Sequence, residues 1–316
     1  MATRDRTVKY LLGLIHDGST EGPKTLRDHF VELNKVTGMY WILTAFLLVG
    51  ADGGDEALVE NVKKRFAVKL NEELNRKGLK LSENGGLLRS LSAVQLSHIL
   101  RIPVEEGIRD QLESFFTEAL REGHEPFWLD QRGLYCLVSI MRLTNNMNLL
   151  TEARKRYLVT RIENSQSVLG GFGAREHSEP HSGYTFCAVA ALKLLDAEIP
   201  RSRRLTAWLT ERLRESNGRP GKPRDSCYLW WNAASLINIG RLHIVEQEKE
   251  SIRMFLNEHC FCQDTGGFSK FPSVAVPGED SSVHGKQDPD LFHTFLSVAC
   301  LALLEGKVDP LTVVPV

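Results

Sequence analysis

Apolar segments of helical length recur along the chain, separated by segments in which apolar and charged residues are mixed. Six of these segments are apolar on nearly every side, which predicts helices buried on most of their faces. They span residues 39–50, 87–100, 133–143, 184–195, 227–240 and 291–306. They recur at intervals of about 45 to 50 residues, except for the last gap, and this spacing indicates an internal repeat.

The charged segments between them carry apolar residues at spacings of three and four, as in helices with one face outward. They span residues 56–74, 107–121, 151–166, 204–216 and 245–259. Glycine-rich turns at 170–173, 217–220 and 266–269 precede three of the apolar segments. No run alternates with period two, so we expect few strands. The alternation predicts an all-α fold in which six helix pairs form a closed ring around an apolar cavity.

The chain has 316 residues, of which 42% are apolar and 25% charged, as in an ordinary soluble globular protein. We expect a single domain over residues 1–316. Residues 272–287 are rich in Pro, Gly, Ser and charged residues and stretch the last repeat, so we expect an insertion loop there.

The formal net charge is −1, which gives no bulk attraction to nucleic acid or to an anionic membrane. No segment approaches the roughly 18 uninterrupted apolar residues of a membrane span, and the N-terminus lacks the pattern of a signal peptide. The six cysteines lie mostly inside apolar segments, as is usual in a reducing compartment. We therefore expect a cytoplasmic protein without a membrane span and without a nucleic-acid partner.

Residues 217–231, NGRPGKPRDSCYLWW, combine several chemically active side chains in a short stretch. Asp225 and Cys227 stand at the start of the fifth apolar helix, and His293 stands near the start of the sixth. In a ring these starts are neighbours, so a carboxylate, a thiol and an imidazole can converge. Three such ligands with one open position are typical of catalytic zinc. The same residues also occur as ordinary core or surface residues, so both interpretations stay open.

Donors of hydrogen bonds gather near the same helix starts. Arg219 and Lys222 precede the fifth helix, while His181 and Tyr228 head the fourth and fifth. Such donors could hold a diphosphate and stabilise its charge as it leaves. A solvated turn is the alternative.

Aromatic residues on and beside the apolar helices could line a cavity for an isoprenoid chain, although aromatic residues in such helices are more often plain core. These are Tyr40, Trp41, Phe172, Trp230, Trp231 and Phe292.

Four motifs carry a family resemblance. They are GRPGKPRDSCYLWW (218–231), GGFGAREHSEPHSGYTFCA (170–188), GGFSKFP (266–272) and PDLFHT (289–294). On these motifs the chain resembles the β subunit of protein prenyltransferases, from about Asp5 to the C-terminus. The resemblance implies the α/α toroid that these enzymes share with terpenoid cyclases, and an α-subunit partner. The first three repeats depart from the family because they lack its full glycine-rich turns.

The resemblance also assigns roles to residues. It implies one zinc ion held by Asp225, Cys227 and His293, and diphosphate contacts from His181, Arg219, Lys222 and Tyr228. Arg132, in DQRGLYC, matches a family arginine near the peptide and diphosphate. Thr37 and Gly38 stand where farnesyl enzymes narrow the lipid cavity with a large aromatic residue, which implies the longer geranylgeranyl chain and its diphosphate as the lipid substrate.

The motifs divide between two classes of geranylgeranyl enzyme. GGFSKFP, PDLFH, KPRDSC and DRTVKYL are similar to type I enzymes, which modify C-terminal CaaX motifs of small GTPases of the Rho and Rac kind. TGMYWILT, LLRSLSAVQ and IGRLH are similar to type II enzymes, which modify Rab GTPases delivered by an escort protein. Lys270 matches the place where type I enzymes use a lysine instead of Mg²⁺, so it favours type I without a magnesium requirement.

We therefore expect the catalytic β subunit of a zinc-dependent protein geranylgeranyltransferase of type I. Lys270 is expected to be a catalytic residue together with the zinc ligands. The type II enzyme is the alternative. A non-catalytic toroid scaffold is a further possibility, and a terpene cyclase is disfavoured because the chain lacks a DxDD motif.

Overall fold

The computed structural model describes residues 2–16, 26–50, 55–81, 86–104, 107–120, 129–272 and 288–316, with the side chains of residues 2, 16 and 26–34 left aside. Within these ranges the chain is built from helices, and its β pairing is limited to isolated bridges. The expectation of an all-α fold is confirmed. Residues 273–287, nearly all of the predicted insertion, lie outside the described residues.

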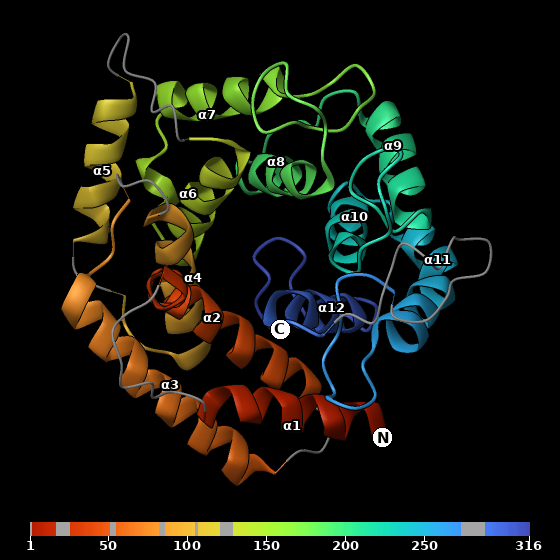
Figure 1. Cartoon of the computed structure of the whole chain (residues 1–316). Helices are drawn as coiled ribbons and strands as arrows, with labels where there is room; N and C mark the ends of the chain where they lie inside the picture. Colours follow the sequence, from red (N-terminus) through yellow and green to blue (C-terminus); the bar gives the residue numbers. More distant parts are fainter. Residues whose placement is uncertain are drawn as a thin grey trace.

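Six helices form an inner ring, in which each helix packs against the next and the last returns to the first (Figure 1). They are α2 (Leu26–Gly50), α4 (Gly86–Leu100), α6 (Gln131–Leu143), α8 (Ser182–Leu194), α10 (Cys227–Asn238) and α12 (Leu291–Leu303). The ring closes where α12 packs on α2. Its members are the segments that are apolar all round, because each has neighbours in the ring on two sides. Outer helices also pack on α2, α4, α6, α8 and α10.

An outer ring of helices surrounds the inner one (Figure 1). It contains α1 (Ala2–His16), α3 (Glu56–Lys77), α5 (Ile108–Ala119), α7 (Glu152–Asn164), α9 (Ser202–Arg214) and α11 (Leu242–Met254). A short 3₁₀ helix, η1 (Met147–Leu149), precedes α7, and a π-helix, η2 (Phe255–Cys260), extends α11. The six predicted helix pairs are confirmed. Five outer helices match the charged segments, and the sixth is α1, which packs on α2.

The starts of α8, α10 and α12 lie close together. His181, the residue before α8, contacts Tyr228 in the first turn of α10, and His293 in α12 approaches Asp225 just before α10. We call this region the rim and define it as residues 179–183, 217–228 and 289–293. The rim brings together residues that are far apart in the sequence, because neighbouring inner helices start at the same end of the ring.

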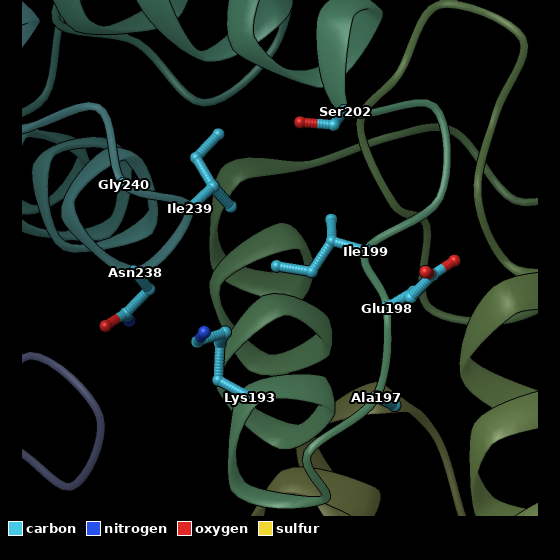
Figure 2. A pocket seen from close by; sticks show the side chains of 8 residues that line it. All are labelled: Lys193, Ala197, Glu198, Ile199, Ser202, Asn238, Ile239 and Gly240. Carbon is cyan, nitrogen blue, oxygen red and sulfur yellow. The ribbon is translucent and has the colours of Figure 1, made fainter.

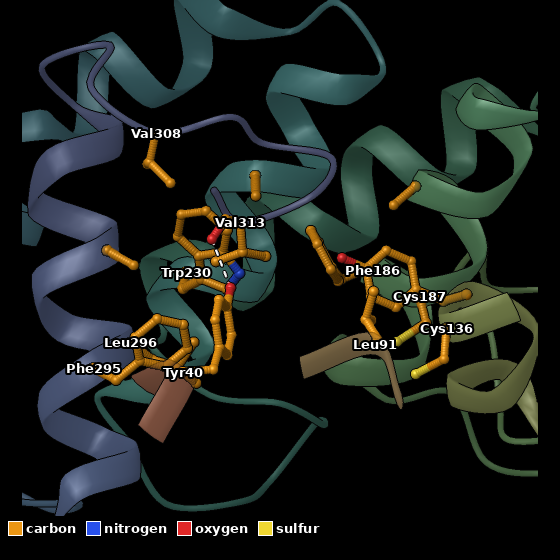
Figure 3. Close-up of a cluster of buried hydrophobic side chains, with 14 of the residues drawn as sticks. Tyr40, Leu91, Cys136, Phe186, Cys187, Trp230, Phe295, Leu296, Val308 and Val313 are labelled. Carbon is orange, nitrogen blue, oxygen red and sulfur yellow. Dashed lines mark hydrogen bonds between the residues drawn. The ribbon is translucent and has the colours of Figure 1, made fainter. Parts of the chain in front are cut away.

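The C-terminal tail, residues 308–316, enters the ring after α12 (Figure 1). Side chains from four inner helices donate hydrogen bonds to its backbone carbonyls. The bonds run from Tyr40 to Val313 at 2.6 Å, from Gln95 to Thr312 at 2.7 Å, from Tyr135 to Leu311 at 2.9 Å and from Asn238 to Pro310 at 2.9 Å. Figure 3 shows the first of these beside the buried aromatic rings of Trp230 and Phe295. The tail is therefore tied into the core.

No helix in the described ranges combines the length and the apolar character that crossing a membrane requires.

Candidate metal and anion site

Asp225, Cys227 and His293 form a buried triad at the rim. One ligand atom from each lies within 4.8 Å of the others, and the three residues are 4%, 5% and 8% exposed. His293 Nε2 lies 3.4 Å from Asp225 Oδ1. One carboxylate, one thiol and one imidazole in this arrangement form a donor set that suits zinc.

Asp290 orients the imidazole of His293. Its carboxylate caps the start of α12 by accepting the backbone N–H of His293 at 2.9 Å, and its second oxygen lies 2.6 Å from His293 Nδ1. Burial alone would lower the pKa of His293, but hydrogen bonds to Asp225 and Asp290 outweigh it and raise that pKa to about 9. Because Nδ1 is engaged by Asp290, Nε2 is the nitrogen that faces the other two ligands, as in many metal sites.

The backbone before α10 holds the other two ligands. The Asp225 N–H donates to Ser216 O at 2.8 Å, and Asp225 Oδ1 accepts the Cys227 N–H at 3.0 Å. Burial, and then the neighbouring Asp225 carboxylate, raise the pKa of the Cys227 thiol well above its ordinary value. A cation bound between them would favour the thiolate and offset the repulsion, so the donor chemistry of the triad fits a divalent metal ion.

Lys270 lies beside the triad. Its Nζ is 4.0 Å from Asp225 Oδ2 and 4.8 Å from the centre of the Phe271 ring. Backbone bonds fix its position, because Lys270 O accepts the Ser226 N–H at 2.9 Å. With 45% of its side chain exposed, the ammonium group can also reach an anion in solution next to the triad.

His181 and Tyr228 form a pair with a defined direction. The Gly183 N–H donates to His181 Nδ1 at 3.0 Å, and His181 Nε2 lies 3.0 Å from Tyr228 Oη. Burial, and then the nearby Arg219, lower the pKa of His181 to about 4, so the ring is neutral at physiological pH. A neutral ring that accepts at Nδ1 carries its proton on Nε2 and donates to Tyr228. The Tyr228 hydroxyl is then left to donate to a further acceptor.

The basic side chains before α10 differ from one another in their surroundings. Arg219 Nη1 pairs with Glu179 Oε2 at 2.9 Å, with 37% of the Arg219 side chain exposed. Lys222 is exposed, and its backbone oxygen accepts a bond from Asn217. Arg224, which neighbours them in the sequence, packs over the Phe255 ring at 5.7 Å. Lys222 is therefore open to an anion from solution, and Arg219 is partly exposed but already bonded to Glu179.

Arg132 lies at the start of α6. Its guanidinium bonds to Asp130 at 2.8 and 3.1 Å and lies 5.5 Å from the centre of the Tyr184 ring. That ring in turn meets the His181 ring edge-on at 5.5 Å. Arg132 is thus linked to the rim through one aromatic residue.

The predicted lipid-pocket residues fall into two aromatic groups and two single positions. Trp41 packs against Phe292 at 5.2 Å, beside Tyr40 and Phe295. Trp231 packs against Phe186 at 5.0 Å, and the Trp230 ring lies 6.2 Å from the same Phe186 ring. The single positions are Phe172, which is fully buried on the loop before α8, and Thr37, which is buried and accepts a bond from Ser92. That these residues line a lipid cavity remains a prediction.

A separate cavity of about 370 Å³ lies at the opposite ends of α8 and α10 (Figure 2). Its lining includes Lys193 in the last turn of α8 and Asn238 in the last turn of α10. It contains none of the residues predicted from the sequence to bind a substrate or a metal.

The sequence did not reveal three partners of the site. Asp290, Glu179 and Asp130 fix His293, Arg219 and Arg132. Asp290 stands three residues before His293, and this spacing on a helix start could have indicated the contact. Asp130 stands two residues before Arg132, a spacing that does not by itself bring two helical side chains together. Glu179 lies 40 residues from Arg219, and no local pattern marks that pair.

Comparison with known proteins relates the chain to one protein family and to relatives of named activity. A family model described as the prenyltransferase alpha-alpha toroid domain matches residues 3–314. A type-1 geranylgeranyl transferase β subunit from Arabidopsis thaliana is 32% identical over 195 residues, which cover 56% of this chain and 46% of the relative. A type-2 β subunit from Saccharomyces cerevisiae is 28% identical over 305 residues, which cover 89% of this chain and 86% of the relative. The chain thus aligns with less than half the length of the first relative.

Among solved structures, Candida albicans protein geranylgeranyltransferase-I complexed with GGPP superposes with a TM-score of 0.73 over 99% of this chain and 95% of that one. The sequence identity is 19%, so this likeness concerns the fold. It agrees with the ring of helix pairs described above.

Proposed function

The chain belongs to the prenyltransferase alpha-alpha toroid family, and on that premise we propose that it is the catalytic β subunit of a zinc-dependent protein geranylgeranyltransferase of type I. Residues 1–316 would act as one domain in the cytoplasm, beside an α subunit. The lipid donor would be geranylgeranyl diphosphate, and the acceptor a C-terminal cysteine of a CaaX protein of the small GTPase class.

One observation carries the proposal. The buried triad of Asp225, Cys227 and His293 lies next to side chains that can donate hydrogen bonds to an anion. Lys270 approaches Asp225 from one side, and Tyr228 follows Cys227 directly in the chain. Metal ligands beside groups that bind an anion suit a reaction in which a thiol takes a lipid from its diphosphate. A scaffold would have no need for this combination.

Asp225, Cys227 and His293 would hold the zinc ion, with Asp290 keeping the imidazole of His293 in place. When bound, zinc would lower the pKa of a substrate thiol and so provide a nucleophile near neutral pH. The thiol gives up its proton to solvent, its sulfur forms a bond with C1 of the lipid, and the bond from C1 to the diphosphate oxygen breaks. The electron pair of the broken bond leaves with the diphosphate.

The residues of the rim would bind the leaving diphosphate. The Tyr228 hydroxyl donates a hydrogen bond to a phosphate oxygen, because its own oxygen already accepts one from His181. Arg219 and Lys222 supply positive charge from the turn before α10. These groups stabilise the charge that develops as the diphosphate leaves.

Lys270 favours type I over type II. A fixed ammonium beside the triad can neutralise the diphosphate charge that Mg²⁺ would otherwise balance. On this proposal the reaction requires zinc and proceeds without magnesium.

The test uses the αβ complex of the chain with its α subunit. We expect about one zinc per β subunit and transfer of the geranylgeranyl group to a CaaX peptide ending in leucine, without escort protein and with Mg²⁺ chelated. Cys227→Ala should lose zinc and transfer, while Cys262→Ala, a half-buried cysteine outside the triad, should keep both.

Three results would contradict parts of the proposal. A complex without stoichiometric zinc, or a Cys227→Ala complex that still transfers lipid, would overturn the zinc enzyme. Transfer only to a Rab protein with its escort protein would replace type I by type II. Zinc without any lipid transfer would favour a scaffold.

A further inference from the structure

Arg212 is a charged residue on the buried face of α9. It shares that face with Leu205, Trp208 and Leu209, and its exposure is 0%. A buried guanidinium lowers stability unless its N–H groups are bonded. Such a residue therefore needs a structural reason.

The guanidinium bonds to the residues at the end of α9. Nη1 donates to Asn217 Oδ1 at 2.6 Å and lies 3.1 Å from Glu215 Oε2, while Nη2 lies 2.5 Å from Glu211 Oε1. Both glutamates are at least half exposed, whereas Asn217 is 4% exposed. The buried partner of Arg212 is thus Asn217.

Asn217 ties the two ends of a turn together. Its Nδ2 donates to Lys222 O at 3.0 Å, and its backbone N–H donates to Arg212 O at 3.2 Å. Its own backbone oxygen accepts a bond from Asn232 in α10 at 3.3 Å. Residues 217–222 are called the cationic turn because Arg219 and Lys222 lie on it. The turn is closed by the Asn217 side chain together with one backbone bond, from the Lys222 N–H to Arg219 O at 3.3 Å.

The cationic turn is packed against the other groups of the rim. The Ser182 N–H, directly after His181, donates to Gly218 O at 3.0 Å. A methyl group on Gly218 would lie 2.2 Å from the Tyr228 ring, so only glycine allows the turn to lie this close. A shift of the turn would move the cations relative to Tyr228 and His181.

We infer that Arg212 and Asn217 are a positioning pair that fixes the cationic turn and thereby sets the affinity of the rim for a diphosphate. Neither side chain touches the anion; each acts through the backbone that carries Arg219 and Lys222. This inference rests on the proposed function, because it assumes that the rim binds the diphosphate of the lipid donor.

The experiment measures binding of inorganic diphosphate to the zinc-loaded αβ complex by calorimetry, together with the KM values for geranylgeranyl diphosphate and for the CaaX peptide. Asn217→Ala should weaken diphosphate binding about 10-fold, the effect of losing one to two buried hydrogen bonds. The KM for the lipid diphosphate should rise in parallel, while the KM for the peptide and the zinc content stay unchanged.

Two further variants separate positioning from folding. Asn217→Asp keeps the acceptor for Arg212 but replaces the donor by an oxygen that faces Lys222 O and Glu215 Oε2, so it should weaken binding at least as much as Asn217→Ala does. Arg212→Lys combined with Asn217→Ala should bind no worse than Asn217→Ala alone, because the two residues act as one unit.

Asn238→Ala is the matched control. This buried asparagine bonds to Pro310 O, away from the rim, so its loss should lower stability and leave diphosphate binding unchanged.

Unchanged diphosphate affinity in Asn217→Ala and Asn217→Asp, with only a lower melting temperature, would show a merely structural role and overturn the inference. The same conclusion follows if Asn238→Ala weakens binding as much as Asn217→Ala. A wild-type complex that binds no diphosphate would instead overturn the proposed function, and the inference with it.

Discussion

The rim and the C-terminal tail both place polar groups inside the ring, but the groups differ in kind. At the rim, ionisable side chains face one another: His293 lies between two carboxylates, and Lys270 approaches Asp225. The tail uses neutral donors such as Gln95 and Tyr135, each of which meets a backbone carbonyl. The rim thus holds ionisable groups at a buried place, whereas the four bonds that hold the tail join neutral groups.

This difference separates function from stability. Burying ions costs free energy unless each is paired, and so a cluster like the rim is retained for what it binds. A neutral hydrogen bond to a buried carbonyl adds about 1 kcal/mol and leaves no group unpaired. We therefore expect substitutions at the rim to change activity and metal content, and substitutions at the tail to change stability.

The largest effect should come from the triad. Asp225→Ala should remove bound zinc and reduce lipid transfer to background, because a ligand and a partner of both His293 and Lys270 are lost together. Asp290→Asn, which only orients His293, should cost about 10- to 100-fold in metal affinity or activity. Metal analysis and a transfer assay on the αβ complex measure both. Equal losses in the two variants would contradict the separate roles.

Deleting residues 311–316 should test the tail. The deletion removes the acceptors of Tyr40, Gln95 and Tyr135 and should lower the free energy of unfolding by at least about 3 kcal/mol. Urea unfolding measures the change. Val316→Ala, at a residue that is 89% exposed and that keeps its backbone bond to Lys307 O, should have an effect within about 0.5 kcal/mol. A tail deletion without loss of stability would remove the contrast with the rim.

His181 should make stability depend on pH in an acid window. Folding lowers its pKa from 6.5 to about 4, so the unfolded chain takes up the proton first as the pH falls. The stability that the neutral ring contributes is present above pH 6.5 and is lost between pH 6.5 and 4, by at most about 3 kcal/mol. His181→Asn, which keeps a helix cap, should flatten this slope.

The smallest effect should come from Glu179, the partner of Arg219 at the exposed edge of the rim. An exposed ion pair contributes little to stability, so Glu179→Gln should change the free energy of unfolding by less than about 1 kcal/mol. It should also free Arg219 and tighten binding of inorganic diphosphate about 2- to 3-fold, measured by calorimetry. Weaker binding in this variant would show that Glu179 holds Arg219 in its binding position.

The sequence predicted the ring because the signal is strong. Helices such as α8 and α12 are apolar on every side, and only a site between two neighbours and an outer layer buries such a helix. The convergence of Asp225 with His293 followed from the repeat, since helix starts in a ring are adjacent. The type of enzyme rested on family motifs.

Other features left little or no trace in the sequence. The tail bonds through backbone carbonyls, which every residue has, so no residue type marks its position. The helix α1 mixes charge with apolar residues, and its pairing with α2 shows only in contacts such as Arg4 with Val49 O. Arg212 reads as an ordinary charge on an outer helix unless its place on the apolar stripe of α9 is noticed.

The closure of the ring has a consequence for synthesis. The bond between Tyr40 and Val313 joins residues 273 positions apart, and α12 must meet α2 before the ring is complete. Contacts of such long range form slowly, because the intervening chain has to be ordered first. During synthesis, the apolar surface of α2 that packs on α12 therefore stays uncovered until residues near 300 have left the ribosome. We expect nascent chains of this protein to depend on chaperones until that point.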